Sequence, residues 1–547
     1  MKIVIIGGVA GGATAATRLR RLSEENEVII FEKGQYVSFA NCGLPYHISG
    51  TIEERNALLL QTPESLKERY NLDTRVFSEV TNINIEEKKV IVKNLQTDEI
   101  YEETYDKLLL SPGAEPIRPP FEGINSDKIY TLRNIPDMDR IVQKTKDAQN
   151  FVVVGGGFIG LEVAENLIEV GKNVKLIELG NQVMAPVDYD IASYIHHKAK
   201  EKGLELLLNV GVQKFEDHKD SITVFLNNDT SIETDAVILA IGVKPETQLA
   251  KNVGLMIGET GGILVNGFMQ TSNPDIYAVG DAVEVEHFIH QRKVLIPLAW
   301  PANRQGRLVA DNITFGNKNK YSGSLGSSIL KFFELSIAST GLNEKFLKRN
   351  NIPHKTAIVT RGHHAGYYPG AKNITLKLIF NDEGKIYGAQ AVGEKGIDKR
   401  IDVIATAIKG NLTVFDLPEI EITYAPPFNS AKDPVNIVGY TAENMLNGNL
   451  EMINYDDLFQ YQEDKNAILL DVRTPTEFAR GSIKGSINLN VDDLRENLTQ
   501  LDKNRNYVIY CQVGLRGYLA YKILKNNGFK VVNLNGGYGL WSMIYPN

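Results

Sequence analysis

Cysteine is almost absent from this chain, with two occurrences in 547 residues. Two cysteines so far apart do not form a disulfide framework, which favours a reducing, cytoplasmic environment. Cys42 lies in the stretch Ser-Phe-Ala-Asn-Cys-Gly-Leu-Pro, and Cys511 directly follows the apolar residues 507–510. Free cysteines are commonly small buried hydrophobic residues, whereas glycine and polar neighbours are typical of exposed, reactive thiolates. The sequence therefore predicts two separate sites of sulfur redox chemistry.

Long hydrophobic runs and an excess of basic residues are also lacking. No stretch approaches the roughly 18 apolar residues that a membrane span needs. The first residues read as a β-strand entering a glycine turn, not as a signal peptide, so we expect an intracellular protein. A net charge of −8 and a pI near 5.8 argue against a nucleic-acid partner. The length predicts three or four domains.

A dinucleotide-binding pattern opens the chain. A short β-branched run, residues 3–6, enters Gly-Gly-Val-Ala-Gly-Gly at 7–12, and an alanine-rich helix follows. The next apolar strand, residues 28–31, ends at Glu32. Glycines permit the tight turn, the helix N-terminus holds a pyrophosphate, and the carboxylate binds ribose hydroxyls. Val9 stands where the usual pattern has its middle glycine, yet strand, helix, strand and acid together predict a nucleotide site.

A second, complete copy begins at residues 151–154. It continues through Gly155, Gly157 and Gly160 into a helix, and the strand at 174–177 ends at Glu178. A carboxylate at this position accepts hydrogen bonds from a free 2′-hydroxyl and repels a 2′-phosphate. The second site is therefore predicted to prefer NADH over NADPH.

Three further segments resemble those of flavoproteins with two dinucleotide-binding domains. Residues 276–282, Ile-Tyr-Ala-Val-Gly-Asp-Ala, resemble the second flavin segment, in which the aspartate contacts the ribityl chain. Residues 111–114 and 240–243 resemble the two crossover segments. The resemblance implies an electron path from NADH to FAD. It implies FAD contacts from Gly7, Gly8, Val9, Ala10, Gly11, Glu32, Lys33, Val80, Ser111, Gly113, Gly280, Asp281 and Ala299, and NAD contacts from Gly155, Gly157, Gly160, Glu178 and Gly242.

The segment around Cys42 resembles the single-cysteine members of these flavoproteins, most closely the coenzyme A-disulfide reductases. Residues 395–400 and the Tyr-Ala-Pro-Pro at 424–427 carry the same resemblance, which extends from residue 1 to about 445. It implies that coenzyme A supplies the missing second thiol, as a mixed disulfide with Cys42. It also implies that coenzyme A is bound by Thr14, Arg18, Arg21, Ser38, Asn41 and Lys432. Thr14, Arg18 and Arg21 are spaced to share one face of the first helix, which otherwise reads as a solvated face.

Two tyrosines also match family residues that reach the thiol from a partner subunit, namely Tyr367 and Tyr424. A phenol can donate a proton to a leaving thiolate, although many tyrosines simply pack at interfaces. The resemblance thus implies a catalytic homodimer. The expected organisation is an α/β chain: an FAD-binding domain at 1–115 and 240–322 and an NAD-binding domain at 116–239, both Rossmann-like, then an α+β dimerisation domain at 323–445 and an α/β rhodanese domain at 446–547.

The C-terminal part resembles a single rhodanese domain over about 95 residues. Residues 467–478, 481–488 and 535–538 and the loop from Cys511 to Arg516 carry the resemblance, with Ser482 replacing a frequent histidine. Successive backbone N–H groups and a helix N-terminus can stabilise an anionic sulfur in such a loop, and Arg516 adds a positive charge. Cys511 is therefore expected to carry sulfane sulfur.

The two halves together indicate an NADH-dependent flavoenzyme that reduces coenzyme A disulfide and coenzyme A persulfide or polysulfide. A disulfide reductase alone has no need of a sulfane-sulfur carrier, whereas a persulfide reductase does. Three alternatives stay open: an NADH oxidase that uses a Cys42 sulfenic acid, a plain sulfurtransferase, and a redox sensor that binds coenzyme A. A peroxidase is disfavoured because residues 8–11 lack the histidine of peroxidase-like relatives.

Overall fold

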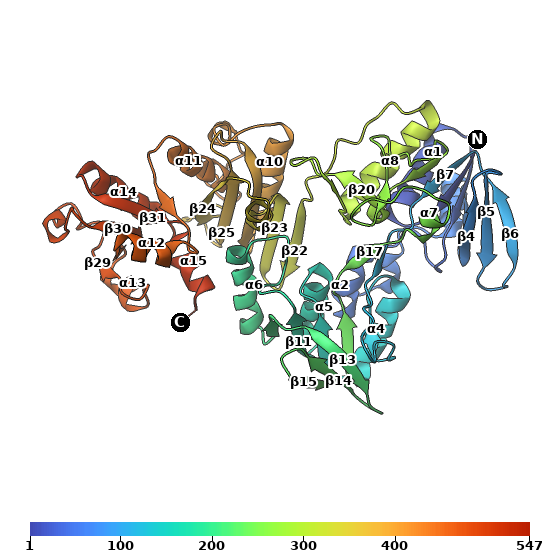
Figure 1. Cartoon of the computed structure of the whole chain (residues 1–547), viewed down its shortest axis with the longest axis horizontal. Coiled ribbons are helices and arrows are strands. Elements are labelled where there is room, and N and C mark those ends of the chain that lie inside the picture. Colours follow the sequence, from blue (N-terminus) through green and yellow to red (C-terminus); the bar gives the residue numbers. More distant parts are fainter. Residues whose placement is uncertain (547) are drawn as a thin grey trace. The chain divides into compact units, whose positions relative to one another are not determined.

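The computed structural model describes residues 1–546 and divides into two compact units (Figure 1). The first unit contains Met1–Val183 and Lys202–Gly326, and the second contains Met184–Glu201 and Ser327–Asn547. Each unit has sheets and helices of its own, and each is described separately.

A five-stranded parallel sheet forms the core of the first nucleotide-binding domain. Ile3, Val4 and Ile5 of its central strand are fully buried, as expected for a β-branched run covered on both faces. The strand order is β19 (Ile276–Ala278), β7 (Lys107–Leu110), β1 (Lys2–Ile6), β2 (Glu27–Phe31) and β3 (Asp73–Arg75).

The second nucleotide-binding domain repeats this plan. Its parallel sheet runs β12 (Glu205–Leu208), β11 (Asn173–Glu178), β10 (Asn150–Val154), β16 (Ala236–Leu239) and β9 (Ile129–Tyr130). Smaller sheets complete the unit: β4 (Ser78–Asn84) with β5 (Lys89–Asn94) and β6 (Ile100–Thr104), β13 (Val212–Asp217) with β14 (Ile222–Leu226) and β15 (Ser231–Thr234), β8 (Ala114–Pro116) with β17 (Val243–Pro245), and β18 (Ile263–Leu264) with β20 (Val283–Glu286) and β21 (Lys293–Val294).

Helices of the first unit pack closely where small residues permit it. A Cβ atom on Gly306 would lie 2.4 Å from the carbonyl oxygen of Gly11, so glycine is required where α1 meets α8. This contact brings α8 beside the first glycine turn. The helices of the unit are α1 (Ala10–Leu22), α2 (Leu44–Ile48), α3 (Pro63–Tyr70), α4 (Ile135–Asp147), α5 (Phe158–Glu169), α7 (Gln248–Asn252) and α8 (Ala299–Phe315).

An antiparallel sheet forms the first half of the second unit. Its order is β22 (Ser328–Phe332), β23 (Leu335–Gly341), β26 (Ile386–Gly393), β25 (Asn373–Phe380) and β24 (Lys355–Gly362). The helices that accompany it are α6 (Tyr189–Glu201), α9 (Glu344–Arg349), α10 (Ile397–Lys409) and α11 (Pro434–Leu446). This α+β arrangement is the one expected for the third domain.

A buried ion cluster fixes α6 to this antiparallel sheet. The Lys377 ammonium, on β25, is fully buried and lies 3.2 Å from Asp188, 2.7 Å from Asp190 and 2.5 Å from Glu344. Buried charges are tolerated when they are paired in this way. Residues 184–201 therefore group with the second unit, which differs from the sequence-based boundary that placed them in the NAD-binding domain.

The C-terminal domain of the second unit has a parallel sheet of its own and is drawn in orange to red in Figure 1. Its sheet runs β27 (Met452–Ile453), β31 (Lys530–Leu534), β30 (Asn506–Tyr510), β28 (Ile468–Asp471) and β29 (Ile487–Asn488). Its helices are α12 (Leu458–Lys465), α13 (Pro475–Ala479), α14 (Leu515–Asn526) and α15 (Gly537–Ile544). The expected fold class is confirmed.

Candidate active sites

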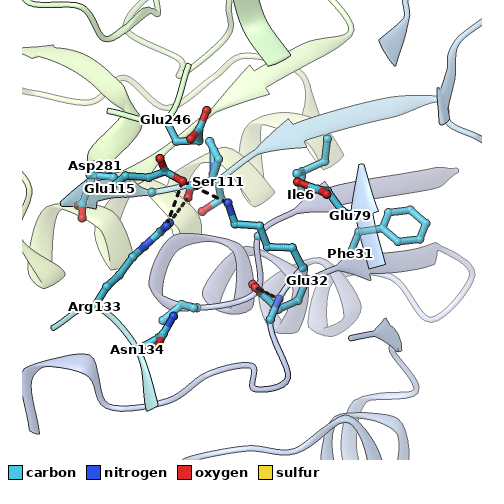
Figure 2. Close-up of a pocket in the computed structure, with 18 of the residues that line it drawn as sticks. Ile6, Phe31, Glu32, Glu79, Ser111, Glu115, Arg133, Asn134, Glu246 and Asp281 are labelled. Carbon is cyan, nitrogen blue, oxygen red and sulfur yellow. Dashed lines mark hydrogen bonds and ion pairs between the residues drawn. The ribbon is translucent and has the colours of Figure 1, made fainter. Parts of the chain in front are cut away.

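A cavity of about 600 Å³ opens at the carboxyl ends of β1 and β7 (Figure 2). Ligands bind at this end of the strands in doubly wound sheets. Among the residues expected to hold FAD, those that line the cavity are Gly7, Val9, Ala10, Gly11, Glu32, Lys33, Val80, Ser111, Gly113, Gly280 and Asp281. Gly8 and Ala299 are not in the lining: Gly8 donates a backbone hydrogen bond to Glu32, and Ala299 begins α8.

The first glycine turn has the backbone that the sequence pattern requires. Gly7 adopts a φ of +97°, and a Cβ atom on Gly12 would lie 1.9 Å from the Gly7 carbonyl oxygen. The Glu32 carboxylate accepts hydrogen bonds from the N–H of Gly8 at 3.0 Å and of Gly34 at 2.8 Å. The acid is thus held beside the turn, where ribose hydroxyls would compete for its oxygens.

The second glycine turn repeats this geometry. A Cβ atom on Gly160 would lie 1.9 Å from the Gly155 carbonyl oxygen. The Glu178 carboxylate accepts hydrogen bonds from the N–H of Gly156 and of Gly180, each at 2.7 Å. Gly157 caps α5, and Gly242, which has a φ of +116°, follows β16. The acid and the glycines expected at the NAD site therefore surround one strand-to-helix turn.

The residues of the first cavity fit a flavin dinucleotide. Burial raises the pKa of Asp281 to about 6, although the Arg133 guanidinium opposes this shift. Within residues 1–546, the Asp281 carboxylate accepts no hydrogen bond, so its oxygens are available to a hydroxylated ligand. Arg133 and Lys33 each lie 3.3 Å from Glu115 at the same pocket, as Figure 2 shows for Arg133. Sequence reasoning did not find Arg133 or Glu115, which belong to no recognisable motif.

Cys42 lies at the surface of the first unit, in a short 3-10 turn (Asn41–Gly43) just before α2. The surrounding protein raises the pKa of its thiol, and the carboxylates of Glu162 and Asp281 raise it further. The Tyr46 hydroxyl donates a hydrogen bond to Glu162 at 3.3 Å. Burial raises the pKa of Glu162 to about 7, so this acid titrates near neutral pH. Glu162 and Tyr46 were not identified from the sequence, because α5 and α2 meet only in the folded chain.

Of the residues of the first unit that were expected to bind coenzyme A, some contact α8 and others are exposed or lie near Cys42. The Thr14 hydroxyl donates to Asn303 at 2.6 Å, and Arg18 pairs with Asp311 at 2.8 Å, so both contact α8. Arg21 is exposed one turn further along α1. Two more of these residues precede Cys42 in the same loop: Ser38, which adopts a φ of +46°, and the exposed Asn41.

Two tyrosines expected near the thiol lie together in the second unit. The Tyr367 and Tyr424 hydroxyls are 3.1 Å apart, and the side chains are 77% and 48% exposed. Lys432, also expected to bind coenzyme A, is exposed in the segment that precedes α11. These exposed phenols and the ammonium are available to a ligand or a partner chain.

A buried arginine fixes the two loops that carry the tyrosines. Arg400 is 2% exposed and lies 2.9 Å from Asp433. Its guanidinium donates to the His363 carbonyl at 2.8 Å and to the Asn429 side chain at 3.0 Å. The Ala365 N–H in turn donates to the Asn429 carbonyl at 3.0 Å. Arg400 is therefore a positioning residue for both tyrosine loops, and its contacts could not be predicted from the sequence.

Cys511 follows β30 and is 1% exposed, so the exposed position expected for both cysteines is found only for Cys42. Its side chain packs in the core of the C-terminal domain, because β30 is buried on both faces. The sulfur still accepts a hydrogen bond from the Gly514 N–H at 3.1 Å, and α14 begins at the next residue. Gly514 has a φ of +115°, a conformation that suits glycine. The loop thus provides a backbone donor and a helix N-terminus beside the sulfur.

Two arginines near this loop are already paired with carboxylates. Arg516 makes two hydrogen bonds of 2.7 Å to Glu477, a partner that the sequence did not indicate. This pairing lowers the pKa of Glu477 to about 2. Arg473 lies 2.6 Å from the fully buried Asp471 and donates to the Gln512 side chain at 3.0 Å. Both guanidiniums stabilise the loop, but their charge is largely compensated.

Family models cover most of the chain. Residues 1–306 match the pyridine nucleotide-disulphide oxidoreductase model, residues 327–434 match the dimerisation domain of the same family, and residues 454–544 match the rhodanese-like domain. Over the described residues, 1–546, no helix combines the length and apolar character needed to cross a bilayer.

Individual relatives and solved structures are similar to this chain over the same domains. A coenzyme A disulfide reductase of Staphylococcus epidermidis is 38% identical over 448 residues, which are 81% of this chain and 100% of the relative. The crystal structure of reduced Bacillus anthracis CoADR-RHD has a TM-score of 0.97 and 51% identity, covering 100% of this chain and 98% of that one. A NAD-dependent persulfide reductase from A. fulgidus has a TM-score of 0.94 and 35% identity, covering 99% and 100%. The chain therefore belongs to the pyridine nucleotide-disulphide oxidoreductase family, as an FAD-dependent oxidoreductase with a C-terminal rhodanese domain.

Proposed function

We propose that this protein is an NADH-dependent reductase of coenzyme A disulfide and coenzyme A persulfide or polysulfide, acting through Cys42. The observation that carries the proposal is the combination of an exposed Cys42 beside the flavin-type cavity with a second sulfur site at Cys511. Relatives named coenzyme A disulfide reductase and NAD-dependent persulfide reductase support the substrate class. FAD, when bound in the cavity, supplies the transfer of two electrons from NADH to the sulfur centre.

Cys42 performs the exchange chemistry. Its thiolate attacks one sulfur of coenzyme A disulfide, a Cys42–coenzyme A mixed disulfide forms, and one coenzyme A thiolate leaves. Two electrons then cleave the mixed disulfide and return the Cys42 thiolate and a second coenzyme A thiolate. With coenzyme A persulfide the same attack on the inner sulfur releases hydrosulfide. Glu162, whose pKa is raised to about 7, bonds to Tyr46, and its charge raises the pKa of the Cys42 thiol.

Several residues assist this chemistry in the proposal. Thr14, Arg18, Arg21, Ser38, Asn41 and Lys432 bind the phosphates and amides of coenzyme A, and Thr14 and Arg18 also hold α1 against α8. In a homodimer, Tyr367 and Tyr424 of the partner subunit donate a proton to the leaving thiolate. The dimerisation-domain match and the exposure of both tyrosines support this arrangement.

The C-terminal domain handles sulfane sulfur. Cys511 takes a sulfur atom from a donor, holds it as a persulfide beside the Gly514 N–H and the start of α14, and passes it to coenzyme A or to the Cys42 centre. Glu178, bonded to two glycine N–H groups, selects NADH because a 2′-phosphate would meet its negative charge.

The test is anaerobic NADH oxidation with coenzyme A disulfide and coenzyme A persulfide in parallel, using wild type and Cys42→Ser. We expect both substrates to be reduced, sulfide to be released from the persulfide, and the variant to be inactive with both. NADH oxidation that requires oxygen and no thiol substrate would instead favour an NADH oxidase, a reading supported by the likeness to the Lactobacillus brevis water-forming enzyme at 28% identity and a TM-score of 0.79. Sulfur transfer without NADH oxidation would leave only a sulfurtransferase.

A further inference from the structure

Asn535 of the C-terminal domain bonds to the edge of the antiparallel sheet in the second unit. The Asn535 side chain accepts a hydrogen bond from the Ile358 N–H at 2.9 Å and donates one to the Thr356 carbonyl at 2.9 Å. Both partners belong to β24, and Asn535 is 2% exposed. Ile358 also packs against Leu540 and Ile544 of α15. β24 is therefore fixed to the segment that follows β31.

That segment is also the support of the Cys511 loop. The Tyr538 N–H donates to the Cys511 carbonyl at 2.8 Å. A Cβ atom on Gly537 would lie 2.5 Å from the same carbonyl oxygen, so the two backbones touch. Only Gly536 separates Asn535 from Gly537. The strand β24 and the sulfur loop are consequently held by neighbouring residues of one short segment.

Arg361 lies three residues beyond Ile358 on β24 and is half-buried. Burial lowers the pKa of Arg361, and an electrostatic interaction with Cys511 opposes this shift. Unlike Arg473 and Arg516, Arg361 has no carboxylate partner and no hydrogen-bond acceptor anywhere in residues 1–546. Arg361 is thus a cation without a counter-charge that interacts electrostatically with Cys511.

An unpaired charge that is partly removed from water raises the free energy of the folded chain. An anion bound at the guanidinium would remove this penalty, and arginine binds planar and tetrahedral oxyanions with several donors at once. Neither Arg473 nor Arg516 can do this without giving up its own carboxylate. The antiparallel domain therefore supplies a cation, and the C-terminal domain supplies the nucleophile.

We propose that Arg361 is the anion-binding residue of the Cys511 site and receives the negatively charged group of a sulfane-sulfur donor of the thiosulfate class. This inference rests on the proposed role of Cys511 as a sulfur carrier. In the step, the Cys511 thiolate attacks the outer sulfur of thiosulfate, the new Sγ–S bond forms, and the S–S bond breaks. Sulfite leaves with the electron pair of that bond, and Arg361 neutralises its charge as it leaves. Cyanide or a thiolate then removes the transferred sulfur and restores Cys511.

The first test measures anion recruitment without assuming any sulfur chemistry. In a Cys42→Ser background Cys511 is the only thiol, so its alkylation can be followed directly. Negatively charged iodoacetate is compared with neutral iodoacetamide in three forms that differ only at the cation: Arg361, Arg361→Met and Arg361→Lys. Lys355→Met, on the same strand at its far end, removes an equal charge elsewhere and serves as the control.

Arg361→Met should lower the ratio of the iodoacetate rate to the iodoacetamide rate about tenfold, because hydrogen bonds to charged groups are lost. Arg361→Lys should retain most of the ratio, and Lys355→Met should leave it unchanged. An unchanged ratio in Arg361→Met would overturn the inference. A thermal midpoint of Arg361→Met no lower than that of wild type would show that the loss is not caused by unfolding.

The second test uses thiosulfate and cyanide as sulfur donor and acceptor in the full chain. Arg361→Met should raise the KM for thiosulfate about tenfold and change NADH-dependent reduction of coenzyme A disulfide little. A KM equal to that of wild type would reject Arg361 as the donor-binding residue. If wild type itself transfers no sulfur from thiosulfate, the proposed role of Cys511 with this donor fails, whereas the alkylation ratio still decides whether Arg361 binds anions.

Discussion

Glu162 provides a quantitative test of the environment of Cys42. Burial raises the pKa of this carboxyl from 4.5 to about 7, and its nearest hydrogen-bond donor is the Tyr46 hydroxyl at 3.3 Å. One pKa unit corresponds to about 1.4 kcal/mol, so holding the charged form in the folded chain costs about 3 kcal/mol at high pH. Below pH 4.5 the carboxyl is neutral in both the folded and the unfolded chain, and the cost vanishes.

Glu162→Gln should therefore stabilise the protein at pH 8.5 by up to about 3 kcal/mol and have little effect at pH 4, with the change between pH 4.5 and 7. The variant gains stability only at high pH because an acid with a raised pKa destabilises the folded wild type as the pH rises from 4.5 to 7. Urea unfolding of wild type and variant at both pH values measures the difference, and Glu169→Gln, at the exposed end of the same helix, is the control. A shift of equal size at both pH values, or one shared by the control, would refute the reasoning.

Four other outcomes are expected. Cys42→Ser should abolish reduction of every disulfide and persulfide in the NADH oxidation assay, and normal turnover would contradict the mechanism. Cys511→Ser should spare coenzyme A-disulfide reduction but impair the use of polysulfide or thiosulfate, and equal activity with all donors would make the domain dispensable. Glu178→Arg should shift the ratio of the kcat/KM for NADPH to that for NADH upward, and an unchanged ratio would show that the ribose contacts lie elsewhere. Arg400→Met should lower the free energy of unfolding by about 3–5 kcal/mol, because Asp433 loses its buried partner, and calorimetry showing no loss would argue against that pair.

The geometry of both nucleotide-binding turns could be predicted from the local sequence. Gly7 and Gly12, like Gly155 and Gly160, are required by backbone contacts within a single strand–turn–helix unit, so their spacing alone predicted the geometry. Cys511 was located by the same kind of local pattern. Its burial was not, because exposure depends on what packs over a strand and not on the residues beside it in the chain.

The features of the sites that the sequence did not predict depend on residues far apart in the chain. Arg18, which was expected to bind coenzyme A, also pairs with Asp311, 293 residues away, because α1 and α8 approach closely. Glu162 and Arg361 belong to no motif, and each gains its significance only from a cysteine that another element brings near. A single sequence contains no signal for such pairs, since period and spacing describe neighbours within one element.

The hydrogen bonds of Asn535 have a consequence for aggregation. β24 is the last strand of its sheet, and its Ile358 N–H and Thr356 carbonyl point away from β25, where another strand could pair. The Asn535 amide satisfies both groups and so takes the place of a neighbouring strand. Exposed sheet edges invite pairing between chains. A chain shortened to remove the C-terminal domain would thus expose the unpaired edge of β24 and should aggregate more readily. The C-terminal domain therefore protects this sheet edge in addition to providing a sulfur site.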